Sequence, residues 1–178
     1  MKSTTSKPIQ LASVVGFPDG SWYGTESKVA ETAIAIENGA NEIDVVLNYR
    51  LLNQRLCSEA RNEIIKVVRC ADQEGVLVKL IFETSELSPG RIIDACNLAG
   101  ECGVDFIKTS TGFGKYGARV EDLKIMRENF KEGIKISGGV NPDNYKELLM
   151  AASWRKDDYI DLDPLKIRIG ESSLLSKL

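Results

Sequence analysis

The feature that most constrains the fold is a loose repeat of about 30 residues, in which a helical segment ends at a glycine and an apolar, β-branched run follows. The four glycines are Gly39, Gly75, Gly103 and Gly133, and the runs after them are Glu42 to Leu47, Val76 to Phe82, Val104 to Lys108 and Ile134 to Ser137. A helix plus a strand takes about this length in successive βα units. We therefore expect parallel strands joined by helices.

Helices are predicted between these runs. Apolar residues recur at spacings of three and four near residues 25–38, 58–74, 89–101, 119–130 and 142–152. Ser88-Pro89 and Asn141-Pro142 are typical of an N-cap followed by the first helical residue. The four glycines suit the position just after a helix, where a positive φ costs little.

Two further apolar runs, Leu11 to Phe17 and Leu165 to Ile169, bring the number of expected strands to six, with no linker between them. Six parallel strands admit either an open doubly wound α/β sheet or a (β/α)8 barrel, of the TIM type, that lacks two units. The whole chain, 1–178, is expected to form a single domain.

Charge and hydropathy narrow the classes of partner. The 23 Lys and Arg against 26 Asp and Glu leave a net charge of −3, which provides no basic surface for nucleic acid or an anionic membrane. No apolar run is long enough to span a membrane, and Met1 to Pro8 is polar rather than a secretory segment. A small-molecule partner and a cytoplasmic location are the expectations.

Ionisable side chains interrupt four of the predicted strands, although buried parallel strands are normally near-continuous Val, Ile and Leu. They are Glu42, Asp44, Lys79, Glu83, Lys108 and Lys135. Side chains alternate with period two, so Lys79 should share a face with Glu83. A single such lysine could lie at a strand end and reach solvent, but lysines in three consecutive strands favour a shared polar cavity at the carboxyl ends of the strands.

The absence of histidine excludes an imidazole base and a histidine-ligated metal. The four cysteines form no C-x-x-C pair, so no metal site is expected. A neutral lysine amine can attack a carbonyl to form a Schiff base, and a second ammonium nearby favours the neutral amine. Lys108 and Lys135 could form such a pair, and Asp44 could move protons through a bound water. The pattern suggests aldol or retro-aldol chemistry without assigning roles.

Five motifs spread over the chain resemble the deoxyribose-phosphate aldolase family. They are SVVGFP (13–18), EIDVV (42–46), FIKTSTG (106–112), KISGGV (135–140) and RIGESSLL (168–175). The resemblance implies a TIM barrel in which Lys108 forms the Schiff base, Lys135 is the second lysine that assists it, and Asp44 relays protons. It also implies reversible cleavage of 2-deoxy-D-ribose 5-phosphate to acetaldehyde and glyceraldehyde 3-phosphate in deoxyribonucleotide catabolism, with no metal or organic cofactor. Lys79 and Glu83 would support the lysine network.

The resemblance also places a phosphate site. Four glycines allow backbone N–H groups to approach an anion closely, and two serines at the start of a final helix can donate to it. These residues are Gly112, Gly138, Gly139, Gly170, Ser172 and Ser173.

The same resemblance predicts that the chain contains about six βα units and that the first two units of a barrel are missing. A barrel of this kind takes about 250 residues. Open strand edges would favour a homo-oligomer or another partner. Two alternatives therefore stay open: a non-catalytic aldolase-like protein that binds a phosphorylated metabolite or a protein, and a Schiff-base aldolase with another phosphorylated substrate.

Overall fold

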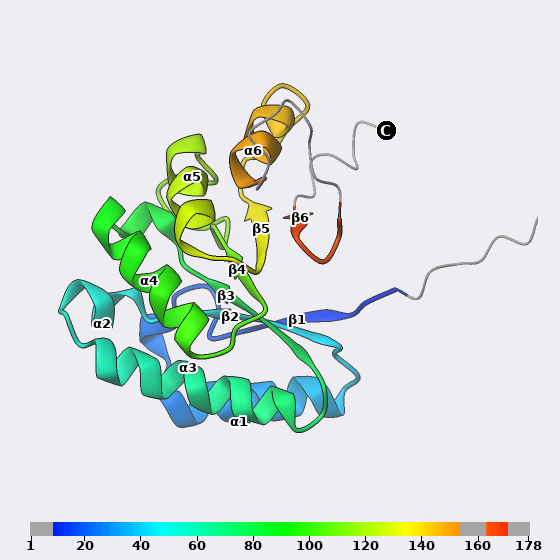
Figure 1. Ribbon diagram of the computed structural model, residues 1–178. Helices are drawn as coiled ribbons and strands as arrows, with labels where there is room; N and C mark the ends of the chain where they lie inside the picture. The colour runs from blue at the N-terminus through cyan, green and yellow to red at the C-terminus, as the bar shows by residue number, and fades with distance from the viewer. Residues whose placement is uncertain (1–8, 154–162, 171–178) are drawn as a thin grey trace, which may run out of the picture.

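The part of the chain that the structure describes forms one sheet of six parallel strands, and their order in the sheet follows their order in the chain. The computed structural model describes residues 9–153 and 163–170. The strands are β1 (Ala12–Val15), β2 (Glu42–Val46), β3 (Leu77–Ile81), β4 (Phe106–Lys108), β5 (Gly133–Ser137) and β6 (Ile167–Gly170). A doubly wound sheet would reverse its strand order at one point. This sheet does not, and it curls instead (Figure 1), so the barrel-type expectation is confirmed.

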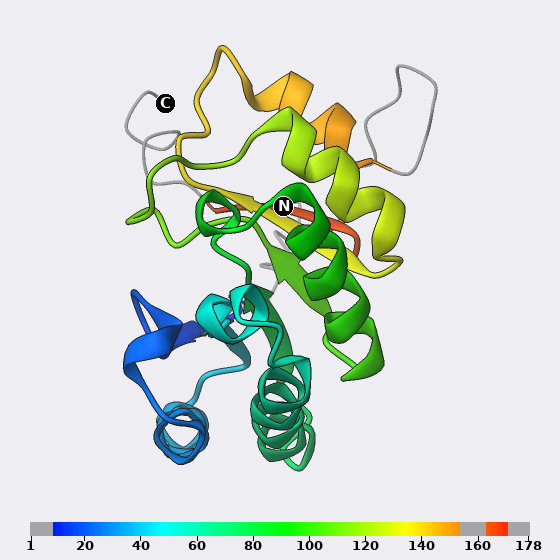
Figure 2. The same ribbon diagram turned by 90° about the vertical axis from the view of Figure 1, so that its left-hand side faces the viewer.

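Helices follow the strands and pack against one another in chain order on the outer side of the curl (Figures 1 and 2). They are α1 (Thr25–Glu37), α2 (Tyr49–Asn53), α3 (Cys57–Asp72), α4 (Pro89–Glu101), α5 (Val120–Asn129) and α6 (Tyr145–Ala152), with 3-10 turns η1 (Gly20–Trp22) and η2 (Thr84–Glu86). The sequence did not predict α2 or the two turns. No helix within the described ranges is both long and apolar enough to cross a membrane.

On β2 and β3, side chains that join the apolar core alternate with ionisable side chains on the inner face of the sheet. Ile43 and Val45 on β2 point toward the helices and join the hydrophobic core, while Asp44 between them points to the inside of the curl. The same alternation sets Leu80 of β3 in the core and Lys79 on the inner face. The inner face is therefore where the ionisable side chains meet.

Several helix ends agree with the sequence. The Ser88 side chain accepts a hydrogen bond from the Arg91 N–H, as expected for the N-cap of α4. Gly39, Gly75 and Gly103 all have positive φ after their helices.

The start at Pro142 of the helix predicted over 142–152 is wrong. The Asn141 side chain accepts hydrogen bonds from the N–H groups of Asp143 (2.9 Å) and Asn144 (3.2 Å). It therefore caps a turn over 142–144, and α6 begins only at Tyr145.

Gly133 also differs from its predicted place after a helix. It is the first residue of β5, and a Cβ there would overlap the Phe106 ring on the neighbouring strand. A close approach rather than a positive φ is the reason why glycine is required at this position.

Two glycine substitutions test this account of the packing. Gly133→Ala should lower the free energy of unfolding by about 1–3 kcal/mol, because the added methyl group overpacks the strand pair. Gly100→Ala should raise it by about 0.5–1 kcal/mol, because Gly100 lies within α4 and a Cβ there meets nothing within 4 Å. Urea unfolding of the two variants measures both values. Equal effects of the two substitutions would contradict the assignment.

Candidate active site

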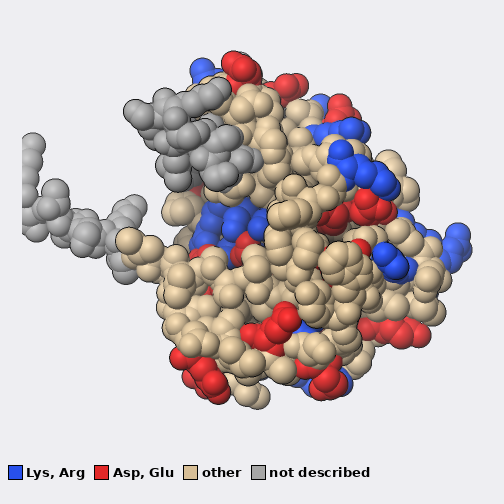
Figure 3. Space-filling view, turned by 180° about the vertical axis from the view of Figure 1, so that it is seen from behind, with Lys and Arg blue, Asp and Glu red and all other residues tan. Residues whose placement is uncertain are grey.

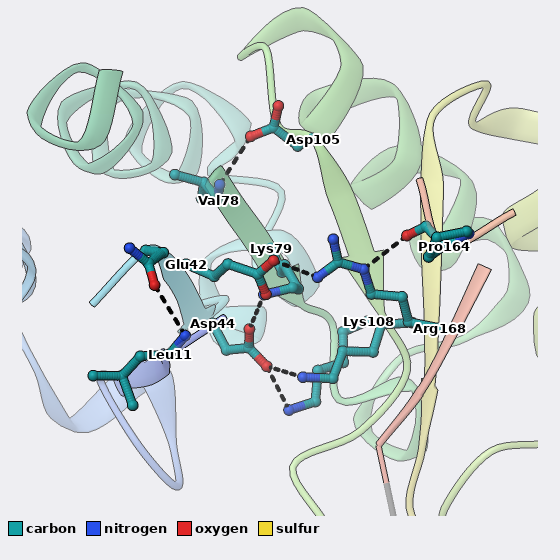
Figure 4. Close-up of polar contacts among 11 residues, drawn as sticks. Leu11, Glu42, Asp44, Val78, Lys79, Asp105, Lys108, Pro164 and Arg168 are labelled. Carbon is teal, nitrogen blue, oxygen red and sulfur yellow. Dashed lines mark hydrogen bonds and ion pairs between the residues drawn. The ribbon is translucent and has the colours of Figure 1, made fainter. Parts of the chain in front are cut away.

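The Asp44 carboxylate on β2 is the centre of the polar interior. It is 2% exposed and contacts three lysine amines, those of Lys79 (2.8 Å), Lys108 (3.0 Å) and Lys135 (2.7 Å). These lysines lie on β3, β4 and β5, so one side chain connects four strands (Figure 4). The structure thus brings together the two lysines and the aspartate that the sequence singled out, with Lys79 beside them.

A second carboxylate, that of Glu42, extends the network. Its oxygens contact the Lys79 amine at 2.5 Å and the Arg168 guanidinium on β6. The sequence marked Glu42 as a charge within a strand but not as a site residue, although its place two residues before Asp44 puts both on one face. Arg168 was missed. Four cationic side chains thus share two carboxylates, and the excess of positive charge favours anionic ligands and neutral amines.

Burial and charge act on these groups in opposite directions. Burial by itself would raise the pKa of Asp44, but the charges of Lys108, Lys79 and Lys135 outweigh it and hold this pKa far below the usual range. The pKa of Lys135 is lowered, because burial disfavours its charged form and the charges of Lys108 and Lys79 add to this, against the opposing effect of Asp44. The site therefore contains a carboxylate that stays ionised beside an amine that loses its proton more readily than a free lysine.

An open cleft of about 470 Å³ lies over the two lysines. Figure 3 shows Lys and Arg side chains gathered in a hollow on this face of the molecule. The cleft is lined by Lys108, Lys135 and Ser137, by Thr111 and Tyr116, and by six glycines: Gly112, Gly114, Gly117, Gly138, Gly139 and Gly170. Four of these glycines are the predicted phosphate-site glycines. Ser172 and Ser173 lie outside the described residues.

The expected position of Glu83 beside Lys79 is wrong, and its support of the lysine network stays a prediction. Strand β3 ends at Ile81, and Glu83 has a left-handed φ of 52°, so the alternation that would have placed it beside Lys79 stops before it. Its carboxylate accepts hydrogen bonds from Thr111 and Ser85 instead.

Other reactive groups do not gather into a second centre. Within residues 9–153 and 163–170, no three His, Cys, Asp or Glu side chains are grouped so that they could hold a metal ion. The four cysteines are free, and burial raises the pKa of the Cys96 thiol to about 12. Such a thiol is a poor nucleophile.

The curled parallel sheet, with two lysine amines and a carboxylate below a glycine-lined cleft, defines a barrel-type protein equipped for lysine Schiff-base chemistry. A family model described as DeoC/LacD family aldolase matches residues 2–156. The chain belongs to this family.

Curated relatives and solved structures agree with the family. The chain is 44% identical over 134 residues to a deoxyribose-phosphate aldolase of Thermococcus kodakarensis, covering 74% of this chain and 59% of the relative. It is 45% identical to one of Aciduliprofundum boonei, covering 75% and 60%. The structure of a putative deoxyribose-phosphate aldolase from Coccidioides immitis superimposes with a TM-score of 0.81 at 30% identity, covering 95% of this chain and 62% of that one. The chain spans about three fifths of the length of the curated relatives it matches.

The excess of positive charge leads to a stability prediction. Lys135→Met should raise the melting temperature at pH 7 by about 2–4 °C, the effect of about 1 kcal/mol in a domain of this size, because it removes one of four cations that share two carboxylates. Since the folded-state pKa of Lys135 is lowered, the gain should be largest at the lowest pH of the series and should shrink as the pH rises toward the ordinary lysine value of about 10.4.

Thermal unfolding between pH 6 and pH 10 checks this, with Lys66→Met as a matched control. Lys66 forms an exposed ion pair with Glu26, so its replacement should change little. A Lys135→Met variant that is less stable than the control at pH 7 would contradict the charge account.

Proposed function

We propose that this protein acts as a class I aldolase, which cleaves 2-deoxy-D-ribose 5-phosphate reversibly to acetaldehyde and D-glyceraldehyde 3-phosphate. The observation that carries the proposal is the position of the Lys108 and Lys135 amines, both within 3.0 Å of one Asp44 oxygen at the floor of a glycine-lined cleft. The names of the curated relatives supply the substrate. The activity is a lyase reaction in deoxyribonucleotide catabolism.

The first step is attack of the Lys108 amine on the aldehyde carbon of the open-chain sugar. Attack requires the neutral amine, and return of one proton to the adduct followed by loss of water then gives a protonated Schiff base. Lys135 in its neutral form can take the proton that Lys108 must lose, because both amines contact the same Asp44 oxygen, and Asp44 relays this proton without keeping it. The positive charges of Lys79 and Arg168 make it unfavourable for the Lys108 and Lys135 amines to be protonated at the same time.

Cleavage follows from the electron demand of the Schiff base. A base removes the proton of the C3 hydroxyl and the bond between C2 and C3 breaks. The electron pair of this bond forms a double bond between C1 and C2, while the electron pair of the C=N double bond moves onto the nitrogen, which gives an enamine. Glyceraldehyde 3-phosphate leaves at this point. Protonation of the enamine carbon and addition of water then release acetaldehyde and restore the Lys108 amine. The water consumed here balances the water lost in the first step.

The phosphate of the substrate is assigned to the glycine side of the cleft. Gly112, Gly138 and Gly139 line the cleft with positive φ, a backbone conformation that recurs in the concave segments that bind anions. Gly170 lines the same side. Ser172 and Ser173 stay predicted donors.

Self-association and location belong to the same proposal. A deoxyribose phosphate aldolase from Aeropyrum pernix, whose structure is described as a unique tetramer, superimposes with a TM-score of 0.73 at 28% identity, covering 82% of this chain and 61% of that one. This supports a homo-oligomer, and a cytoplasmic location stays an expectation from the sequence.

Trapping of the Schiff base tests the proposal directly. Borohydride added to the purified chain with acetaldehyde should reduce the imine and leave a stable ethyl group on Lys108, located by peptide mass spectrometry. Lys108→Leu should abolish the adduct, while Lys66→Leu, at an exposed lysine, should leave it intact. Folded protein without an adduct would refute the proposed reaction, and an adduct on Lys135 instead would refute the assignment of the nucleophile.

Asp44→Asn should lower kcat by about 10²-fold or more, the usual size of a lost proton-transfer group. Asparagine can still accept a hydrogen bond from one amine but cannot take up a proton or balance the lysine charges. Steady-state cleavage of 2-deoxyribose 5-phosphate measures the loss. Asp94→Asn, at a partly exposed ion pair with Arg91 on α4, is the control and should retain full activity. Full activity of the Asp44→Asn variant would exclude the proton role.

A further inference from the structure

The environment of Glu83 is unusual for an acidic residue near an anion site. Its side chain is buried, at 4% exposure, and its backbone has the left-handed conformation that few non-glycine residues adopt. Neither feature is explained by the chemistry at Lys108, since the carboxylate contacts Thr111 and Ser85 rather than any lysine. A buried carboxylate in a strained backbone position indicates a specific task.

The hydrogen bonds of Glu83 show what it holds. One carboxylate oxygen accepts from the backbone N–H of Thr111 at 3.0 Å and also from the Thr111 hydroxyl. The other oxygen accepts from the Ser85 hydroxyl at 3.3 Å, and that hydroxyl in turn accepts from the backbone N–H of Lys115 at 3.2 Å. Glu83 therefore holds both ends of the segment 111–115, directly at one end and through Ser85 at the other.

The segment between these two points lies directly on the carboxylate. A Cβ at Gly114 would overlap the Ser85 hydroxyl and the Glu83 carboxylate, so only a bare backbone fits there. Thr111, Gly112 and Gly114 line the cleft above Lys108 on one side of this segment. Glu83 lines a separate hollow, together with Thr111 and Gly114, and not the cleft itself. The segment 111–115 is thus a wall with the cleft on one side and Glu83 on the other.

We propose that Glu83 is a positioning residue that fixes segment 111–115 so that the wall of the cleft is already shaped for the phosphate of the substrate. The inference rests on the proposed function. The negative charge of Glu83 by itself would oppose a nearby anion, so its contribution comes from its hydrogen bonds. A glycine-containing segment without such bonds would have to be ordered at each binding event, at the expense of affinity.

If Glu83 positions this segment, its loss should weaken the binding of the substrate phosphate without changing the reaction at Lys108. Glu83→Ala should raise KM for 2-deoxyribose 5-phosphate about 10-fold, the effect of losing about 1–2 hydrogen bonds that preorganise a site. Cleavage of 2-deoxyribose, which has no phosphate, should change by less than about twofold. The inhibition constant of inorganic phosphate against 2-deoxyribose cleavage should rise about as much as KM does. A residue needed only for folding would affect both sugars alike.

Conservative variants identify the hydrogen bonds as the cause. Glu83→Gln keeps a carbonyl oxygen for both Thr111 donors and removes the charge, so it should restore KM to within about threefold of the unmodified protein. Thr111→Val removes one donor and keeps the shape, and combined with Glu83→Ala it should add less than its separate effect, because the two groups share one interaction. Glu26→Gln, at an exposed ion pair with Lys66 and away from segment 111–115, should change KM by less than about twofold.

The outcomes distinguish this inference from the proposed function. Equal losses with both sugars, a Glu83→Gln variant as weak as Glu83→Ala, or full additivity with Thr111→Val would each overturn the positioning role. If Glu83→Ala does not fold, the comparison of Glu83→Gln and Thr111→Val on the two sugars decides the same point. Calorimetric titration of the unmodified protein with inorganic phosphate needs no turnover. Phosphate binding that weakens in Thr111→Val would support the wall even if no adduct forms on Lys108.

Discussion

The contact between one buried carboxylate and three lysine amines is the interaction on which the rest of the structure depends. Asp44 would be costly to bury alone, and so would Lys79, Lys108 or Lys135, since an unpaired charge inside a protein costs several kcal/mol. Together they offset one another only if four strands bring them to one point. The curl of the sheet and the pairing of charges therefore require each other, and the cleft over the lysines follows from both.

The two faces of the sheet divide the work of stability and chemistry. The outer face joins the helices in a continuous apolar core, and substitutions there act on folding. The inner face contains more positive than negative charge, which reduces stability but suits a reaction that needs a neutral amine and an anionic ligand. Arg168 also bridges β6 to Glu42 on β2 across the interior, with its guanidinium 4.6 Å from the Phe106 ring, so strands that share no ladder are connected through side chains.

The sequence allowed much of the fold and part of the site to be predicted, for identifiable reasons. Lys108 and Lys135 stood out because a charge in a buried strand violates the expected pattern. Glu83 was misplaced because the left-handed turn after β3 ends the alternation of faces, and no local signal marks that turn. Arg168 was missed because its carboxylate partner is 126 residues away. Lys28, whose amine is fully buried against a glutamate of α3, was missed because a helical lysine normally lies in solvent.

The alternation of faces along β2 makes the position of every side chain in that strand depend on its register. The strand consists of the two carboxylates, Glu42 and Asp44, and three apolar residues, Ile43, Val45 and Val46, and all five are buried. A deletion or insertion of one residue within it would move both carboxylates into the hydrocarbon core and leave four cations unbalanced. An insertion or deletion of two residues would return each side chain to its own face but would move the carboxylates along the strand, away from their positions opposite the lysine amines. Changes of length are thus tolerated only in the loops outside the strand, whereas apolar side chains on its outer face can be replaced by others of similar volume.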